Sequence, residues 1–441
     1  MQNGDDERQE TDRPDHTAVF IKMNNDGDDN HLATDGETAG DIDSDDETDA
    51  ELLARARRGI EADVLEVLRA VETGALEDVR TMITRDPVLV LRAADTEGRS
   101  SFYIACMMDR PAVASLLLDV RGVDVNRANV RGVTPLFAAS QDGRAAIVRL
   151  LIDAPGVDVN LVNSEGDTPL NVASYFGHAA CVERLLRAPG IDANASGPNA
   201  PLHAAAQQGH AAIVAALLGA SGVDVNRLDV DRATPLLVAA EQGHAAIVAS
   251  LLAAPGVAVN LGDGDGTTPL LVAAENGHAA TVALLLAAPG VDVNRATTES
   301  GTTPLGAACS GGHAAVVARL LGAPGIELDN HAAAHRRPLL LAATGGHDAV
   351  VRLLVWRGAS LAGEFANDVV ARARLEGHVA TAAFLRAVRA AGGVEQYRAE
   401  PLRQVEREGA RARRLGVCGG KRDLDRATAK GSSAAREQLV S

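Results

Sequence analysis

Apolar and polar residues follow a pattern along most of the chain that returns at a fixed interval. Four stretches show it in full: TPLFAASQDGRAAIVRLLIDAPGVDVN, TPLNVASYFGHAACVERLLRAPGIDAN, TPLLVAAEQGHAAIVASLLAAPGVAVN and TPLLVAAENGHAATVALLLAAPGVDVN. The closing Asn falls at 126, 160, 194, 226, 260 and 294, with Asp329 next, so the steps are 34, 34, 32, 34, 34 and 35 residues. Such a period is typical of a solenoid, in which each unit packs on its neighbours.

Each unit predicts a first short helix, and the copy that starts at Thr268 shows why. The Thr268 hydroxyl can cap a helix whose first position is Pro269, where a missing N–H costs nothing. The pair Ala273-Ala274 is small enough for a neighbouring helix to approach closely. The helix is predicted to end at Gly277, because glycine best adopts the left-handed conformation that follows a helix.

A second helix is predicted from His278 onward, with Val282, Leu285 and Leu286 spaced to line one face. The following Pro-Gly breaks it. The stretch VDVN at 291–294 alternates apolar and polar residues like a short extended arm, and RATTESG after it is rich in turn formers. We therefore expect a hairpin or a long loop before the next Thr-Pro.

Two short antiparallel helices, an arm and a Thr-Pro-Leu mark in about 33 residues resemble the ankyrin repeat. The resemblance covers roughly residues 62–390 and implies an all-α solenoid of about ten units, including atypical terminal caps. The units are expected near 62–97, 98–131, 132–165, 166–197, 198–231, 232–265, 266–300, 301–334, 335–361 and 362–390. We assign 52–390 to the solenoid, 1–51 to an acidic disordered tail and 391–441 to a basic-leaning disordered tail.

Some copies depart from the family pattern. The copy with His203, the family's usual His after Leu, has Ala200 in place of the capping Thr and a loop two residues shorter. Arg337 replaces the capping Thr before Pro338, and Ser100 and Ser101 stand for Thr-Pro in an earlier copy. We expect local irregularity at the first of these places.

The charge is unevenly distributed. Of the formal net charge of −17, −15 lies in residues 1–51, which hold 18 acidic and 3 basic residues; from Arg386 onward there are 13 basic and 7 acidic residues. The first segment has too few apolar residues to offset its ordering entropy, so disorder is expected. The repeats keep a charge of −8 and show no continuous basic face. We therefore expect no nucleic-acid partner.

The remaining composition bears on location. The start MQNGDDERQE has no apolar run after positive charge, so no secretory signal is expected, and no apolar stretch is long enough to span a membrane. Cys106, Cys181, Cys309 and Cys418 lack zinc or disulfide spacing, and Cys181 and Cys309 occupy helix positions where other copies have Ala. Small buried thiols fit a reducing compartment, so we expect a cytoplasmic or nuclear protein.

Histidines recur at the start of each second helix: His178, His210, His244, His278, His313, His347 and His378. Stacked helices lie about 8–10 Å apart, whereas the ligands of one zinc ion all lie within about 2.1 Å of it. Equivalent histidines therefore cannot share a metal, and we predict that each braces the stack by bonding to neighbouring backbone. The repeated Asp and Asn of the arms are predicted to form turns.

Other chemistry has no clear motif. The acidic stretches GDGDGTT at 262–268 and DIDSDDETDAE at 41–51 lack the central Gly and the twelfth-position Glu of a calcium loop. No phosphate-binding loop, nucleophile elbow, zinc-protease motif or kinase signature is present. We expect no catalytic residues, no metal and no cofactor.

The resemblance implies binding of partners on a concave face made by the hairpin tips and the residues before each Gly. Those pairs are Gln141-Asp142, Tyr175-Phe176, Gln207-Gln208, Glu241-Gln242, Glu275-Asn276, Ser310-Gly311 and Thr344-Gly345. The tips carry Asn163, Glu165, Asp229, Asp231, Asp263, Asp265 and Glu299, an acidic rim that favours a basic or polar peptide. Tyr175 and Phe176 are the candidate anchor, unless one of them fills the gap left by the shortened next copy.

The predicted function is a monomeric, non-catalytic protein–protein interaction scaffold or adaptor. Three alternatives remain open. A ubiquitin-ligase adaptor would need a recruiting box at the C-terminus, and 402–415 has few apolar residues for one. A nucleic-acid or nuclear-import role would use RARRLGVCGGKR. An orphan structural array would bind nothing, and Tyr175 and Phe176 would then be replaceable.

Overall fold

The computed structural model describes residues 49–195, 200–329, 337–361 and 363–397. By its internal contacts the chain divides into two compact units, unit 1 up to Val223 and unit 2 from Asp224. Within the described ranges, regular secondary structure is helical, apart from an isolated antiparallel bridge between Ala94 and Ser100. The predicted all-α class is confirmed.

Unit 1 begins with three helices and continues as helix pairs. The first three are α1 (Asp49–Thr73), α2 (Leu76–Arg85) and α3 (Pro87–Arg92). The pairs are α4 (Ser101–Met107) with α5 (Pro111–Leu118), α6 (Pro135–Gln141) with α7 (Ala145–Ile152), α8 (Pro169–Tyr175) with α9 (Ala179–Leu185), and α10 (Pro201–Gln207) with α11 (Ala211–Leu218).

Unit 2 consists of helix pairs throughout its described length. They are α12 (Pro235–Glu241) with α13 (Ala245–Leu252), α14 (Pro269–Glu275) with α15 (Ala279–Ala287), α16 (Pro304–Ser310) with α17 (Ala314–Leu320), α18 (Pro338–Thr344) with α19 (Asp348–Trp356), and α20 (Gly363–Leu375) with α21 (Val379–Ala390).

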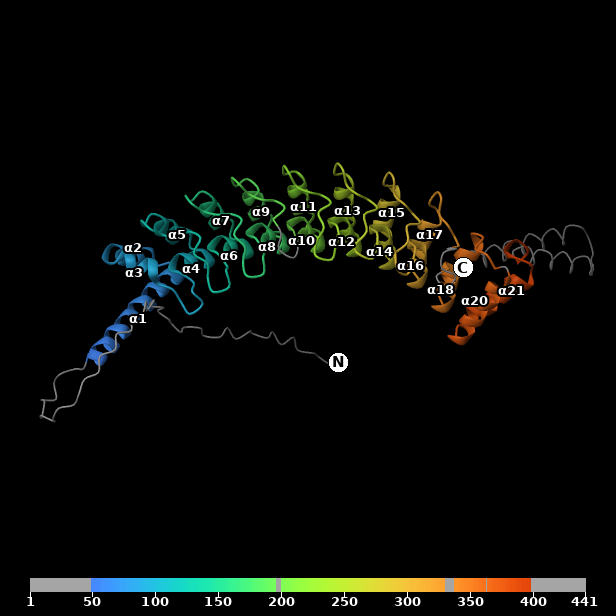
Figure 1. The fold of residues 1–441 in the computed structure, drawn as a ribbon, viewed down its shortest axis with the longest axis horizontal. Helices are drawn as coiled ribbons and strands as arrows, with labels where there is room; N and C mark the ends of the chain where they lie inside the picture. The colour runs from blue at the N-terminus through green and yellow to red at the C-terminus, as the bar shows by residue number, and fades with distance from the viewer. Residues whose placement is uncertain (1–48, 196–199, 330–336, 362, 398–441) are drawn as a thin grey trace, which may run out of the picture. The chain divides into compact units, whose positions relative to one another are not determined.

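Like helices stack on like within each unit. In unit 1 the first helices α4, α6, α8 and α10 pack in sequence, and so do the second helices α5, α7, α9 and α11. Unit 2 repeats this order from α12 and from α13, and Figure 1 shows the first and second helices of each unit as separate rows. Within each unit, every helix pair therefore packs on its sequence neighbours, as the repeat period predicted.

The first helix of each pair from α4 to α18 is buried almost all round. In α14 the residues from Leu270 to Ala274 are buried, and Ala273 and Ala274 have no exposed surface. The second helix α15 buries only one face, with Thr281, Val282 and Leu285 inside. Leu286, which we expected on that face, lies at its edge and is half-buried. The apolar core therefore runs along each unit between the two helix rows.

The predicted helix caps are present. The Thr268 hydroxyl accepts a hydrogen bond from the Leu271 N–H at 3.3 Å, and Thr134, Thr168, Thr234 and Thr303 cap their helices in the same way. Ser100 caps α4. No side chain caps α10 at Ala200 or α18 at Arg337, as the departures from the pattern predicted.

The arms differ from the extended strand suggested by the alternation in VDVN. Residues 291–294 form a turn and a short link instead, and no strand is formed in the described residues. The arm asparagines explain this, because each bonds to the next arm. The Asn260 side chain donates from Nδ2 to the Gly290 carbonyl at 2.7 Å and accepts from the Asp292 N–H at 2.8 Å. Hydrogen bonds from asparagine side chains thus join neighbouring arms, whereas a sheet would join them by hydrogen bonds between backbone groups.

Both ends of the described chain reach beyond the predicted limits of the repeats. Helix α1 has 25 residues, packs on α2 and α4, and begins at Asp49, so the prediction of disorder was wrong for 49–51. Beyond 390, the Tyr397 ring contacts Phe384 edge-on with centroids 5.8 Å apart. The rest of both expected tails, including the possible box at 402–415 and RARR at 411–414, lies outside the described residues.

Candidate functional site

The tip between two repeats is a tight turn held by one side chain. The Asn163 N–H donates to the Asp167 carbonyl at 3.0 Å, and Asn163 Oδ1 accepts from the N–H groups of Glu165 and Asp167. Asn and Asp favour such turns because their side chains can mimic the next peptide group. Asp95, Asn129, Asp229 and Asp263 close their tips in the same way.

This geometry divides the predicted rim residues into two kinds. Asp229 and Asp263 are half-buried, and one oxygen of each accepts two backbone N–H groups, so these residues shape the tip. Asp231 and Asp265 follow two residues later and are exposed. The exposed pair is therefore better placed to meet a partner.

Neighbouring tips are linked within each unit. In unit 1 the Val130 N–H donates to the Glu97 carbonyl at 2.9 Å, and the Ser164 N–H donates to the Arg131 carbonyl at 3.0 Å. In unit 2 the Thr298 N–H donates to the Asp265 carbonyl at 2.9 Å. These bonds hold successive tips side by side, so their side chains form one row in each unit.

A histidine of the next repeat holds the end of α6, α8, α12, α14 and α16. His278 Nε2 bonds the Glu241 carbonyl at 2.8 Å, and His313 Nε2 bonds the Glu275 carbonyl at 2.8 Å. Three further histidines bond the carbonyls of Gln141, Tyr175 and Ser310 in the same way. Because a carbonyl can only accept, each ring must carry its proton on Nε2. The predicted bracing role is confirmed for these histidines.

Histidines of the following repeat also explain the glycine that comes after α6, α8, α12, α14, α16 and α18. Gly277 has φ of +76°, and a Cβ there would lie 2.6 Å from Nδ1 of His313. A Cβ would meet the histidine ring of the following repeat in the same way at Gly143, Gly177, Gly243, Gly312 and Gly346. Backbone conformation and close packing thus both require glycine, and the two residues before it are left at the surface.

Those surface residues are the ones predicted to bind a partner. Most of them are exposed: Gln141, Asp142, Gln207, Gln208, Glu241, Gln242, Glu275, Asn276, Ser310 and Gly311. Thr344 is half-buried, and Gly345 beside it is exposed. Tyr175 and Phe176 are 42% and 49% exposed. We call the surface made by these residues and the tips of the same unit its tip face.

The tip face of unit 1 contains a hollow of about 410 Å³. Helices α4, α6 and α8 contribute Tyr103, Phe137, Gln141, Asn171, Tyr175 and Phe176. The tips contribute Arg131, Asn163, Ser164, Glu165 and Asp167. Three successive repeats therefore supply an aromatic floor and a polar edge to one hollow.

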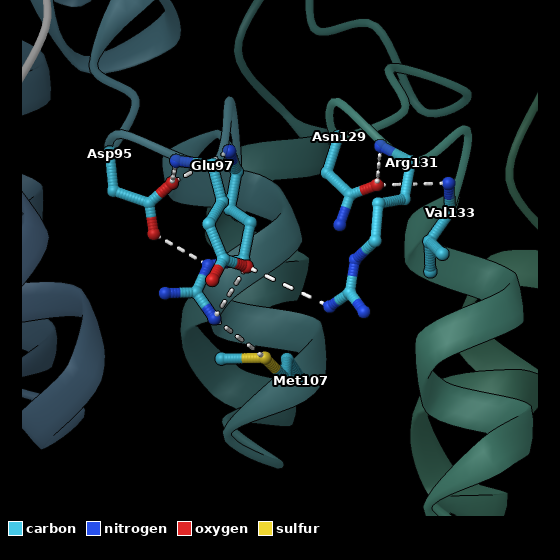
Figure 2. A network of polar contacts seen from close by, with 7 residues as sticks. Asp95, Glu97, Met107, Asn129, Arg131 and Val133 are labelled. Atoms are coloured by element: carbon cyan, nitrogen blue, oxygen red, sulfur yellow. Dashed lines mark hydrogen bonds and ion pairs between the residues drawn. The ribbon is translucent and has the colours of Figure 1, made fainter. Parts of the chain in front are cut away.

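A polar network borders this hollow at its N-terminal side (Figure 2). Arg99 Nε bonds Asp95 Oδ2 at 2.5 Å, and its Nη1 lies 3.6 Å from Glu97 Oε2. Arg131 Nη2 approaches the same Glu97 oxygen at 3.9 Å. The pKa of Arg99 is raised, because its hydrogen bond and charge interactions with Asp95 and Glu97 outweigh desolvation by burial. Its guanidinium therefore remains charged and committed to the tip.

The tip face of unit 2 contains a second hollow, of about 500 Å³. Its carboxylates are Asp265, Glu275 and Glu299, and its hydroxyls belong to Thr267, Thr297, Ser300, Thr302 and Ser310. Leu271, Ala307 and Leu341 form the apolar part of the lining. Among the lining residues described, none is basic. The lining of the unit 2 hollow is therefore acidic, whereas Arg131 makes the charge of the unit 1 lining mixed.

Tyr175 and Phe176 form an aromatic pair on the surface of unit 1. Their rings meet edge-on with centroids 5.2 Å apart, and Phe176 also stacks on His178 at 6.4 Å. Since both rings are exposed, neither fills a buried gap of the kind that a shortened repeat could leave. Both line the hollow of unit 1.

The comparison with known families assigns the repeat. The family model described as "Ankyrin repeats (3 copies)" matches residues 102–197, 155–229, 202–297 and 289–362, which together span more than half of the chain. The chain belongs to the ankyrin repeat family. Ankyrin repeats mediate protein–protein interactions, and proteins built from them are in general non-catalytic binding scaffolds. No curated protein matches this chain.

The part of this ankyrin repeat chain that the structure describes also bears on metal binding, membrane spanning and thiol chemistry. No group of three or more His, Cys, Asp or Glu side chains there could hold a metal ion, and no helix there is long and apolar enough to cross a membrane. Cys106, Cys181 and Cys309 are buried free thiols, as predicted for the latter two, whereas Cys418 lies outside this part. Burial raises the pKa of Cys181 to about 11, opposed by Arg184.

The floor of the unit 1 hollow was not predicted from the sequence. Tyr103, Phe137 and Asn171 occupy the same place in successive ankyrin repeats, two residues after the Pro or its Ser101 equivalent. Comparing that place from copy to copy would have found them, because its side chain differs while its neighbours repeat. Residues that differ within a repeated frame are those free to carry specificity.

Proposed function

We propose that this chain is a non-catalytic scaffold or adaptor that binds partner proteins or peptides on its tip faces. The observation that supports this most strongly is the pair of hollows, one in each unit, both lined by tips and first helices. Concave surfaces with a few convergent polar groups are where proteins usually bind ligands. Several residues predicted from the family resemblance line these hollows, among them Gln141, Tyr175, Phe176, Asp265 and Glu275.

The repeat frame also supports binding at this face. Histidines and arm asparagines bond to backbone groups of the next repeat, so they serve the frame. The pair before each Gly changes from copy to copy, and both of its residues are exposed in most repeats. A rigid frame with variable exposed side chains lowers the entropy cost of binding a long partner.

Charge indicates the kind of partner for unit 2. Its hollow has three carboxylates and no basic residue among its described lining, and Asp231 and Glu241 are exposed nearby on the same unit. Complementary charge steers association and fixes the register of a complex. We therefore propose a basic or polar segment as the partner of this tip face.

The anchor proposed for unit 1 is the pair Tyr175 and Phe176. Exposed aromatics contribute large contact areas at low entropy cost and dominate many interfaces. We place the protein, as a monomer, in the cytoplasm or nucleus; the buried free thiols Cys106, Cys181 and Cys309 support a reducing compartment.

An affinity capture from native cell extract tests the proposal. The intact chain is compared with a Tyr175→Ala/Phe176→Ala variant and with a Glu183→Ala/Arg187→Ala control, whose exposed residues belong to the second helix and the turn after it in the same repeat. We expect proteins captured by the intact chain and the control to be lost from the aromatic variant, as counted by mass spectrometry. Capture of one unchanged set by all three would contradict the anchor, and no specific capture would favour the orphan array.

A further inference from the structure

The hollow of unit 1 contains two carboxylates without a compensating cation. Glu165 and Asp167 line it, and neither carboxylate forms an ion pair or hydrogen bond with a residue that the structure describes. Desolvation by burial, followed by repulsion from Glu165, raises the pKa of Asp167. Two like charges at one edge of a hollow favour a positive group between them.

The basic residue that also lines the hollow does not supply that group. Arg131 carries a side chain that is 72% exposed, and its guanidinium is directed to Glu97 on the preceding tip (Figure 2). No ion pair joins it to Glu165 or Asp167 among the described residues. The charge at this edge is therefore open to a cation from another molecule.

The hydroxyl of Tyr103 adds a further acceptor. The Tyr103 residue is 4% exposed and lines the hollow, and its hydroxyl makes no hydrogen bond with any described residue. Desolvation by burial raises its pKa to about 12, so the hydroxyl stays neutral at physiological pH. Because the residue lines the hollow, its phenol oxygen can accept a hydrogen bond from a ligand there.

Aromatic faces complete the lining. Tyr175 and Phe176 are exposed and meet at 81° to each other, and the Phe137 ring is buried beneath the hollow. A planar cation is attracted to the face of an aromatic ring. The hollow thus combines carboxylates, an unpaired hydroxyl and aromatic rings from three repeats.

We propose that the hollow of unit 1 is a pocket for an arginine side chain presented by the partner protein, an inference that rests on the proposed binding function. Guanidinium has five N–H donors and no acceptor, which matches two carboxylates and a phenol oxygen. It is planar and weakly hydrated, so it stacks on aromatic rings at a smaller desolvation cost than ammonium. The hollow, with a volume of about 410 Å³, accommodates the partner's arginine side chain together with the residues next to it in the partner.

The test uses randomised twelve-residue peptides selected on the full chain by display, followed by affinity measurements on single synthetic peptides. In each selected peptide the arginines are replaced one at a time by citrulline, which keeps the shape and loses the charge, or by lysine. Each peptide is measured against the intact chain, Glu165→Gln/Asp167→Asn, Tyr103→Phe, and the control Asp265→Asn/Glu299→Gln in the other hollow. Circular dichroism and the unfolding midpoint show that each variant is folded.

One arginine is expected to dominate: citrulline at that position weakens binding by about tenfold or more. The Glu165→Gln/Asp167→Asn variant should bind the arginine peptide about tenfold or more weakly than the intact chain does, and should bind the arginine and citrulline peptides equally. The control Asp265→Asn/Glu299→Gln should still bind the arginine peptide more tightly than the citrulline peptide. Tyr103→Phe should lower the affinity for the arginine peptide by a smaller factor.

The contrary outcomes separate the two proposals. If peptides bind without any preference for arginine over citrulline, or prefer lysine, the arginine pocket is wrong and the scaffold function stands. The arginine pocket is also wrong if the control variant abolishes the preference for arginine over citrulline while Glu165→Gln/Asp167→Asn keeps it. If no peptide is selected by the full chain, the proposed function fails and the pocket with it.

Discussion

At the residue scale, the repeat depends on a contact between one glycine and one histidine. Gly277 takes a positive φ, which L side chains rarely adopt, and it also packs against the ring of His313. That ring is held in place because its Nε2 bonds the Glu275 carbonyl. The residue that ends a helix in one repeat is therefore fixed by packing in the next.

Two glycines of unit 2 separate the conformational effect from the packing effect. Gly277 and Gly290 both have φ of +76°, but a Cβ at Gly290 would meet nothing within 4 Å. We expect Gly290→Ala to cost about 1–2 kcal/mol from the left-handed conformation alone. Gly277→Ala should cost at least about 1 kcal/mol more, because the ring must move and its hydrogen bond weakens.

Denaturant unfolding of the full chain measures this difference through the unfolding midpoint. In a His313→Ala background, which removes the ring, the two glycine substitutions should have nearly equal effects. An extra cost of Gly277→Ala that persists without the ring would show that the contact is not its cause.

At the element scale, a first helix with the full repeat pattern, such as α14, is set by its ends. A Thr cap and Pro fix its start, glycine ends it, and Ala on its inner side lets neighbouring helices approach. All of these are local properties of a short stretch, which is why the period and spacing in the sequence predicted the helix pairs correctly. The terminal helix α1 was not predicted at its observed length, because its sequence lacks the repeated marks.

The cap can be tested at Thr268, whose hydroxyl accepts from the Leu271 N–H. Thr268→Val keeps the side-chain volume and removes the acceptor, so we expect a loss of about 1 kcal/mol in the free energy of unfolding. Thr268→Ser retains the acceptor and should cost distinctly less. Equal unfolding midpoints for the Val and Ser variants would contradict the capping role.

The arms and the site show what sequence could not supply. The alternation in VDVN suggested a strand, but the Asn260 side chain bonds the neighbouring arm, a contact about 30 residues away in the chain. The hollow of unit 1 likewise requires Tyr103, Arg131 and Asp167 from different repeats to meet. Spacing predicted which residues are exposed, whereas their grouping into hollows depends on how repeats stack.

At the scale of the whole molecule, we propose that partners contact the tip faces and not the outer side of the second helices. Gln141 and Glu275 represent the tip faces of units 1 and 2, and Glu183 and Arg319 are exposed on second helices of the same units. The histidines, glycines and arm asparagines make the contacts that hold neighbouring repeats together. Most side chains of the tip face do not have this role, so they can differ from repeat to repeat.

Site-specific photo-crosslinking tests this claim most directly. A benzophenone amino acid is placed singly at Gln141, Glu275, Glu183 or Arg319 in the full chain, and crosslinked proteins are identified after irradiation in native extract. We predict that the same specific partners crosslink from Gln141 or Glu275 and not from Glu183 or Arg319. Specific crosslinks confined to Glu183 or Arg319 would contradict binding on the tip faces.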